Sequence, residues 1–325
     1  MSVIEGYNIQ GIIAKGGMAT IYLAQQVSLK RQVALKILSP KIDERIREHF
    51  IDEGRIIAQL KHPNIIPVFD VGRVGVHFYH AMEYLEGGDL EQLINKGLDI
   101  QTALEITLEL ADALHLVHSQ GIIHGDIKPA NVVFRTNGCP VLTDFGISRR
   151  AKQSDDYSVN PDAILASPSY ASPELVQGNA FDMRTDIYSL GIMMYEMLVG
   201  KKPFTGKTKL EVIANSIQQP VPQLPEKLLK LQPLLEQMLA KDVEARIADA
   251  SMITRYLKNF LRHNPSISNR TPDEKRRSPI KSDVVIEYPA EKQNNKINRE
   301  PLLITLASIM VLTTLIALGS WFFLT

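Results

Sequence analysis

This chain has little cysteine and no excess of either charge, and each of these absences excludes a class of structure or partner. Its 325 residues include a single cysteine, Cys139, so no intramolecular disulfide can form. That is typical of a protein kept in a reducing compartment. Lys and Arg together number 36, as do Asp and Glu, which leaves a formal net charge of zero. Without a basic excess no overall field draws the chain to nucleic acid, so we expect no nucleic-acid partner.

The two ends lack different things. Residues 1–11 have neither a basic start nor an apolar core, so we expect that they do not form a cleavable signal peptide. Residues 263–300 are poor in large apolar side chains and rich in Asn, Ser, Pro and charge. Because such a segment cannot bury enough surface to offset its chain entropy, we interpret it as a flexible juxtamembrane linker.

The stretch from Leu302 to Leu324 contains no charged residue. A helix of that length extends about 34 Å, enough to cross a hydrocarbon core of about 30 Å. Basic residues precede it, and Trp321 to Phe323 stand near its far end, as interfacial aromatics often do. We therefore expect a single-pass transmembrane helix at 301–324 in the lipid bilayer of the cell membrane, with the N-terminal domain cytoplasmic. A homodimer formed through this helix is possible, but no strong small-residue motif supports it.

The stretch from His124 to Gly146 carries the chemistry. It reads HGDIKPANVV and, after a polar turn, VLTDFG, which places Asp126, Lys128, Asn131 and Asp144 at fixed spacings. Phosphoryl transfer needs such a set: a carboxylate orients the attacking hydroxyl, a cation steadies the phosphate, and an amide and a second carboxylate hold metal ions. Either triplet alone arises by chance, but HxDxKPxN followed by DFG is highly specific.

This joined pattern resembles the eukaryotic-type Ser/Thr protein kinases, most closely their membrane-anchored bacterial members. The resemblance implies an α+β, bilobal protein-kinase fold, with a small β-rich N-lobe and a larger helical C-lobe, followed by a linker and one transmembrane helix. The implied boundaries are a kinase domain at 1–262 (N-lobe 1–82, hinge 83–88, C-lobe 89–262), the linker at 263–300 and the transmembrane helix at 301–324.

The resemblance implies that a glycine-rich hairpin covers the phosphates of ATP. In YNIQGIIAKGGMATIYLAQ, Gly16 takes the middle glycine position with Gly17 beside it, while Ala14 and Ala19 replace the first and third glycines. Alanine adds a methyl group and largely excludes positive φ, so we expect this loop to hold ATP less tightly.

Lys36, which ends the strand VALK, is implied to hold the α- and β-phosphates and to pair with a helix glutamate. Glu53 stands in the matching place, and Glu48 is its nearest competitor. Ala34 and Val27 are candidates for the roof over adenine.

The remaining nucleotide contacts are implied at the hinge. Met82 aligns with the gatekeeper position, and the backbone from Glu83 to Leu85 would bind adenine. Asp89 would cap the next helix, contact the ribose, or do both. Ile21 completes the expected nucleotide-binding residues.

The resemblance also assigns the catalytic roles. Asp126 is the expected base and orienter of the substrate hydroxyl, and Lys128 neutralises the transferring phosphate. Asn131 and Asp144 would hold two Mg²⁺ ions, hard cations that suit oxygen ligands. The expected cofactors are therefore ATP and Mg²⁺, and the expected substrates are Ser/Thr hydroxyls of proteins.

One departure from the pattern bears on regulation. Gly125 replaces the arginine that grips a phosphorylated activation-loop residue in relatives, which removes the counter-charge for that phosphate. The segment from Asp144 to Glu174 contains serine and tyrosine but no threonine. We expect autophosphorylation on Ser, and activity that does not require phosphorylation of this segment.

Other residues are implied to support the site. Ser167 would help to hold Asp126 and Lys128, Asp186 would bond the catalytic-loop backbone, and Glu174 would pair with Arg246.

Two alternatives to an active protein kinase stay open. A pseudokinase scaffold that binds nucleotide or partners is favoured by Ala14, Ala19 and Gly125. A small-molecule phosphotransferase of the same fold is disfavoured by the SPE and DIYSLG elements, which belong to the protein-kinase branch.

Overall fold

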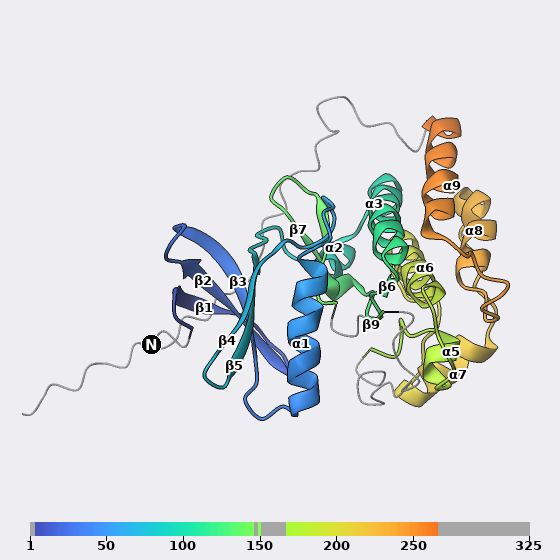
Figure 1. The fold of residues 1–325 in the computed structure, drawn as a ribbon. Coiled ribbons are helices and arrows are strands. Elements are labelled where there is room, and N and C mark those ends of the chain that lie inside the picture. Colours follow the sequence, from blue (N-terminus) through green and yellow to red (C-terminus); the bar gives the residue numbers. More distant parts are fainter. Residues whose placement is uncertain (1–3, 146–148, 151–166, 266–325) are drawn as a thin grey trace, which may run out of the picture. The chain divides into compact units, whose positions relative to one another are not determined.

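A computed structural model of the chain describes residues 4–145, 149–150 and 167–265 (Figure 1), all of them within one compact unit that spans residues 1–287. Within the described ranges, no helix is both long and apolar enough to cross a membrane. The expected transmembrane helix at 301–324 and nearly all of the expected linker lie outside these ranges.

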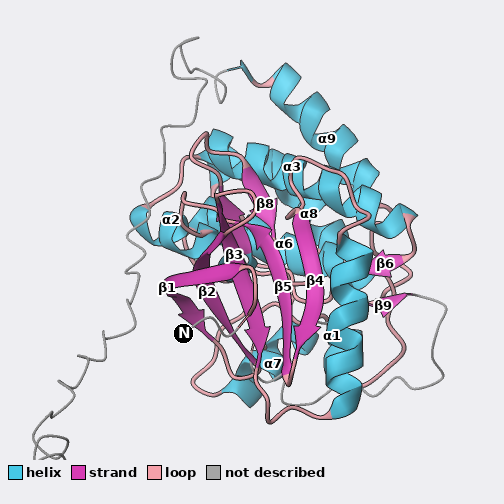
Figure 2. Cartoon of the chain, turned by 60° about the vertical axis from the view of Figure 1, so that its left-hand side comes forward, coloured by secondary structure: helices cyan, strands magenta, loops and turns pink. Residues whose placement is uncertain are grey.

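The N-terminal part is an antiparallel sheet of five strands in the order β1-β2-β3-β5-β4, with one helix against it (Figure 2). Helix α1 packs on β4 and β5. The elements are β1 (Tyr7–Lys15), β2 (Ala19–Gln26), β3 (Arg31–Leu38), α1 (Glu44–Ile57), β4 (Val68–Val74) and β5 (His77–Glu83).

Strand β3 shows how the sheet separates its two faces. Side chains alternate along a strand, so Val33, Leu35 and Ile37 share one face, and all three are buried in a cluster with residues of β1, β2 and β5. Ala34 and Lys36 lie on the opposite face, the one that bears the site described below.

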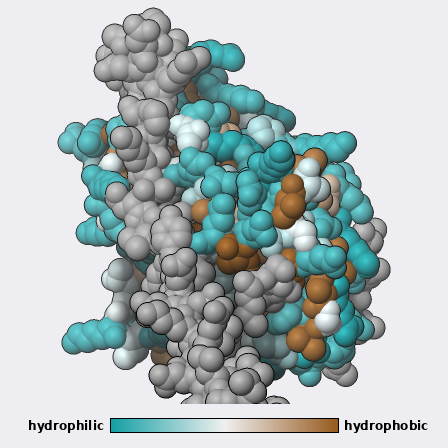
Figure 3. Space-filling view, turned by 90° about the vertical axis from the view of Figure 1, so that its left-hand side faces the viewer, coloured by the Kyte–Doolittle hydropathy of each residue, from teal (hydrophilic) through white to brown (hydrophobic). Residues whose placement is uncertain are grey.

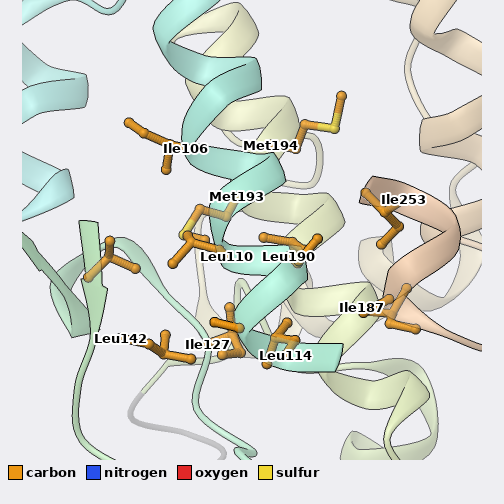
Figure 4. Packing of buried hydrophobic residues seen from close by; sticks show 14 of the residues in the cluster. Ile106, Leu110, Leu114, Ile127, Leu142, Ile187, Leu190, Met193, Met194 and Ile253 are labelled. Carbon is orange, nitrogen blue, oxygen red and sulfur yellow. The ribbon is translucent and has the colours of Figure 1, made fainter. Parts of the chain in front are cut away.

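The C-terminal part is mainly helical, as expected for the larger lobe. Helices α3 and α6 pack against each other, and their apolar side chains meet in the core (Figure 4). The helices are α2 (Leu90–Lys96), α3 (Ile100–Ser119), α5 (Pro173–Val176), α6 (Arg184–Val199), α7 (Lys209–Gln218), α8 (Gln232–Met238) and α9 (Ala250–His263), with the 3₁₀ turns η1 (Pro129–Asn131) and η2 (Glu226–Leu231).

Helix α6 is buried along most of its length, which explains its nearly continuous apolar sequence. Asp186 and Thr185, near its start, are polar exceptions that are fully or almost fully buried. Buried polar groups need partners, and Asp186 finds them in residues 124–131, called here the catalytic loop.

Short strands shape the region between the sheet and the helices. Strand β6 (Ile122–Ile123) pairs with β9 (Arg149–Arg150), and β7 (Val132–Phe134) forms a hairpin with β8 (Pro140–Leu142). The residues from His124 to Asn131 join β6 to β7, and Asp144 follows β8. The four residues of the HxDxKPxN…DFG pattern therefore lie in the loop between β6 and β7 and just after β8.

Candidate active site

Asp186 of α6 fixes the backbone of the catalytic loop, as the sequence predicted. Its carboxylate accepts hydrogen bonds from the backbone N–H groups of His124 and Gly125, both at 2.8 Å, and contacts His118 Nε2 at 2.8 Å. Burial alone raises the pKa of Asp186, but His118 and these donors outweigh it and hold the pKa below its usual value. The anion thus anchors the loop just before Asp126.

The next contacts bring together three of the predicted residues. Asp126 Oδ2 accepts from Lys128 Nζ at 2.7 Å and from Asn131 Nδ2 at 2.8 Å, while Lys128 Nζ also donates to Ser167 Oγ at 3.2 Å. Within the described residues no group bonds Asp126 Oδ1. One carboxylate oxygen is therefore held in place, and the other is available to an incoming hydroxyl.

The expected role of Ser167 is supported for Lys128, which it contacts directly. Its link to Asp126 passes through that lysine.

His124, which the sequence did not single out, holds the same loop from within. Its ring is fully buried; Nδ1 accepts from the N–H of Asp126 at 3.2 Å, and Nε2 lies 3.0 Å from the carbonyl of Thr143. Because Nδ1 accepts, Nε2 carries the proton and donates. Burial lowers the pKa of His124, which favours this neutral ring. The histidine ties the residues before Asp126 to those before Asp144.

Lys36 lies between two carboxylates, on the face of the sheet opposite the Val33 cluster. Its Nζ is 2.9 Å from Asp144 Oδ1 and 4.0 Å from Glu53 Oε1. Burial opposes the charge of Lys36, but Asp144 and Glu53 together raise its pKa. The expected pair with Glu53 is present at its distance limit, and Glu48, the competitor, is exposed.

The pKa directions of Asp144 and Glu53 show which of the two carboxylates Lys36 stabilises more strongly. Burial raises the pKa of Asp144, yet the charge and hydrogen bond of Lys36 bring it below its usual value. For Glu53 burial dominates, and the pKa rises despite the attraction of Lys36. We conclude that Asp144 is the main partner of the lysine here.

Asp144 has a left-handed backbone, with φ of +55°. Such a conformation costs about 1–3 kcal/mol in a residue other than glycine and is often found at functional sites. Asp tolerates it better than most residues. The turn directs the carboxylate toward Lys36.

Asn131 and Asp144 suit a magnesium site by their chemistry. The side-chain nitrogen of Asn131 donates to Asp126, which leaves the side-chain oxygen Oδ1 for a cation. Mg²⁺ keeps several waters and binds through one or two protein oxygens plus substrate phosphates. No group of three or more His, Cys, Asp or Glu side chains in the described residues forms a metal cage.

The glycine-rich hairpin connects β1 to β2. Gly16 N–H donates to the carbonyl of Ala19 at 2.9 Å, and Ala14 pairs with Ile21 across the strands. Neither Ala14 nor Ala19 has a positive φ. The backbone argument against alanine therefore does not apply at these two positions, because extended strands accept any L residue. Weaker binding of ATP by this loop stays a prediction.

The adenine side of the site is only partly as predicted. Ile21 pairs with Lys36, and Ala34 pairs with Met82, so their side chains share one face of the sheet. Val27 does not: it follows the end of β2, at the end of the strand away from the hairpin tip, and is 49% exposed. Figure 3 shows the outer side of the N-terminal part, away from the helices, where the coloured surface is largely hydrophilic with separate apolar spots.

At the hinge, side chains are engaged in structural contacts. Glu83 receives two hydrogen bonds from Arg135, at 2.8 and 2.7 Å, and Leu85 packs against the core. Both Asp89 oxygens are in use, one on the N–H of Gln92 as the cap of α2 and one on its side-chain amide. The capping role of Asp89 is confirmed, and a ribose contact would have to replace the bond to the Gln92 side chain.

The long-range ion pair expected in the C-terminal part is present. Arg246 donates to both oxygens of Glu174, at 2.8 and 3.0 Å, and both side chains are almost completely buried. Burial raises the pKa of Glu174, but the hydrogen bond and charge of Arg246 bring it below its usual value. The pair lies outside the reacting groups and is structural.

His80, the other residue that sequence reasoning missed, locks α1 to the sheet. Its ring stacks on Phe50 with centroids 3.7 Å apart, and Nε2 lies 2.7 Å from the carbonyl of Phe50. Burial lowers the pKa of His80 to about 3, so the ring is neutral and Nε2–H donates. A histidine within the apolar run HFYHAMEY was the signal that could have revealed it.

Comparison with known proteins fits this geometry. Residues 7–260 match the protein kinase domain family. The chain is 35% identical to a probable serine/threonine-protein kinase of Clostridium perfringens over 301 residues, covering 89% of this chain and 43% of that one. It is 35% identical to the serine/threonine-protein kinase PknJ of Mycobacterium tuberculosis, covering 74% and 42%. For the probable serine/threonine-protein kinase PknB of Lactococcus lactis the identity is 33%, covering 75% and 40%. The matched region thus spans about two fifths of these relatives.

Proposed function

The chain belongs to the protein kinase family, in its eukaryotic-type Ser/Thr branch, and we propose that it is an active, ATP-dependent Ser/Thr protein kinase. The observation that carries the proposal is the convergence of Lys128 and Asn131 on one oxygen of Asp126, while no described residue bonds the other oxygen. A scaffold that only bound nucleotide would not need a carboxylate oriented in this way.

The arrangement assigns work to each side chain. Asp126 Oδ1 would orient the substrate hydroxyl and accept its proton, while Lys128 would balance the charge of the transferring phosphate. Lys36 would hold the α- and β-phosphates, with Glu53 limiting its movement. The hairpin at Gly16 and Gly17 would cover the phosphates with backbone N–H groups.

ATP and Mg²⁺ are the proposed cofactors. When bound, Mg²⁺ bridges phosphate oxygens and neutralises their developing charge. Asn131, through its carbonyl oxygen, and Asp144 would hold it. Ile21, Ala34 and Met82 would enclose the adenine, with the hinge backbone from Glu83 to Leu85 as its hydrogen-bonding edge.

Regulation and location extend the proposal. With Gly125 in place of arginine, we propose that activity does not depend on a phosphorylated activation segment; Ser148, Ser154 and Ser158 lie outside the described residues. We further propose that the uncharged stretch 301–324 tethers the kinase to the cytoplasmic face of the membrane, near membrane-bound protein substrates.

Transfer of labelled phosphate from ATP and Mg²⁺ to a generic basic protein acceptor tests the activity. Asp126→Asn keeps the shape but not the base and should lower the rate roughly 10²–10⁴-fold. The matched control is Asp112→Asn, an exposed carboxylate on α3 that should leave the rate unchanged. Equal residual transfer by the wild type and Asp126→Asn, with both folded, would favour the scaffold function.

Deletion of residues 301–325 tests the tether. The full chain should sediment with membranes, and the shortened chain should stay in the supernatant while it still phosphorylates the acceptor. Recovery of the shortened chain in the membrane fraction at the same level as the full chain would contradict a tether in this stretch.

A further inference from the structure

Helix α9 presents a basic face that has no acidic residue. It is the last helix of the described chain, packed on α3 through the buried Ile253, Leu257 and Phe260 (Figure 1). Its sequence, ASMITRYLKNFLRH, contains neither Asp nor Glu. The outward face, called here the α9 face, consists of Met252, Arg255, Tyr256, Lys258, Asn259, Arg262 and His263, all exposed.

The charges of the α9 face are not used by the fold. Within the described residues Arg255, Lys258 and Arg262 take part in no hydrogen bond and no ion pair. Their situation differs from that of Arg135, Arg184 and Arg246, whose guanidinium groups are all bound to carboxylates. The nearest acid along the chain, Asp249, caps the start of α9 and contacts His115.

The turn η2 extends this surface. Tyr256 OH donates to the carbonyl of Lys230 at 2.8 Å, and Lys230 Nζ donates to Asn264 Oδ1 at 3.1 Å, so η2 lies beside the end of α9. Lys227 and Leu229 of η2 are exposed as well, and Glu226 is its single acidic residue. The combined surface has basic groups around exposed apolar side chains.

Apolar exposure narrows the kind of partner. Met252 is 48% exposed and Tyr256 is 36% exposed, among the basic residues. Lys and Arg on a helix face attract anionic lipid headgroups, while apolar and aromatic side chains of the same face enter the boundary below them. Residues 264–300 alone separate α9 from the uncharged stretch 301–324.

We propose that the α9 face, extended by η2, docks the kinase domain onto a membrane surface rich in anionic phospholipid. Each Lys or Arg near such a surface strengthens binding roughly five-fold, and three of them about a hundred-fold. Docking would hold the kinase domain against the surface of the bilayer. This role rests on the proposed tether, whereas affinity of the face for anionic lipid does not.

The test uses the full chain in lipid nanodiscs. Because Cys139 is the single cysteine, Cys139→Ser with Asn259→Cys places one environment-sensitive dye on the exposed α9 face. We expect a blue shift of its emission in discs containing phosphatidylglycerol, no shift in discs of phosphatidylcholine alone, and loss of the shift in 0.5 M NaCl (about a 4 Å Debye length).

Charge-neutralising variants make the test specific. Arg255→Gln, Lys258→Gln and Arg262→Gln together should abolish the shift. Lys201→Gln, Lys207→Gln and Lys209→Gln, a matched set of exposed residues at and before α7, should retain it. Helix α7 lies at the opposite end of the helical lobe from α9 (Figures 1 and 2).

The outcomes separate docking from tethering. No shift in anionic discs, although the chain is incorporated, would overturn docking and leave the tether standing. An equal shift in neutral discs, loss of the shift in both variant sets, or a shift produced only by duplex DNA would also overturn it. If the chain fails to enter discs, the tether fails; co-sedimentation with phosphatidylglycerol vesicles that the α9 variant abolishes would then still support docking, and its absence would refute it.

Discussion

Gly125 is the residue at which this chain departs most clearly from the pattern it otherwise follows. Its φ is +78°, in the left-handed region, and its N–H is bound to Asp186. A residue with a side chain would be strained at this φ, and glycine is not. The glycine therefore lets the catalytic loop adopt the conformation in which its N–H bonds Asp186 without strain, in addition to the proposed loss of a counter-charge for phosphate.

Gly125→Ala should destabilise the protein by about 1–2 kcal/mol, because the left-handed conformation carries a penalty of that size for an L residue. Urea denaturation without nucleotide measures it. Gly17→Ala is the matched control: its φ is not left-handed and an added Cβ would meet no atom within 4 Å. A loss for Gly17→Ala as large as that for Gly125→Ala would contradict the backbone explanation.

At the same scale, the sequence predicted residue types better than their bonds. Asp126, Lys128, Asn131 and Asp144 were identified because their spacing is specific. Val27 was placed wrongly, since a strand's end cannot be read from an apolar residue alone.

Among the elements, α1 depends on a close approach to β5. Gly54, inside α1, would place an added Cβ 2.6 Å from His80 Nε2 and 2.7 Å from Val71 Cγ2. Helix interiors usually disfavour glycine by about 1 kcal/mol relative to alanine. Here the missing side chain of Gly54 lets α1 pack closely on the sheet. Because Gly54 directly follows Glu53, this packing also places Glu53.

Gly54→Ala should therefore lower kcat, although it raises helix propensity, because α1 must move and take Glu53 away from Lys36. A double-mutant cycle with His80→Ala measures the cause. Expressed as free energies of activation from kcat, the losses caused by Gly54→Ala and by His80→Ala should be less than additive by about 0.5–3 kcal/mol, as for residues in contact. Full additivity would mean that the His80 ring is not what limits the approach, with Val71 as the remaining obstacle.

Across the whole molecule, the Glu174–Arg246 pair joins two segments that are 72 residues apart in the sequence. Removing one partner leaves a buried charge, so Arg246→Ala should cost roughly 3–5 kcal/mol of unfolding free energy. Arg55→Ala, which removes an exposed pair with Asp52, should cost no more than about 1 kcal/mol. Urea denaturation of both variants gives the comparison.

The same pair predicts a pH dependence. The pKa of Glu174 is below its usual 4.5 in the folded protein, so the folded state binds this proton less readily than the unfolded chain does. Its stabilising contribution is present above pH 4.5 and is lost as the pH falls through the folded pKa. The stability gap between wild type and Glu174→Gln should therefore narrow below pH 4.5; a gap that does not change with pH would contradict the assignment.

The family and the two-part architecture could be predicted from the sequence alone, and the residues that we propose to react were identified there as well. Glycine breaks, apolar periodicity and the spacing of Asp126 to Asp144 are local properties, and local properties can be recognised in the sequence without knowing the fold. The pairs Glu174–Arg246 and Lys36–Glu53 were also predicted, because the resemblance carried over partners that no local rule supplies.

Other features became apparent only in the folded structure. It showed that Ala14 and Ala19 lie in extended strands and that Asp144 rather than Glu53 is the main partner of Lys36. It also showed that two buried histidines support the site, His80 by bonding the backbone of α1 and His124 by bonding the carbonyl of Thr143. The physical reason is common to all of them. Backbone angles, burial and hydrogen-bond partners depend on which distant segments pack together, and the α9 face likewise became a surface only once α3 had covered its other side.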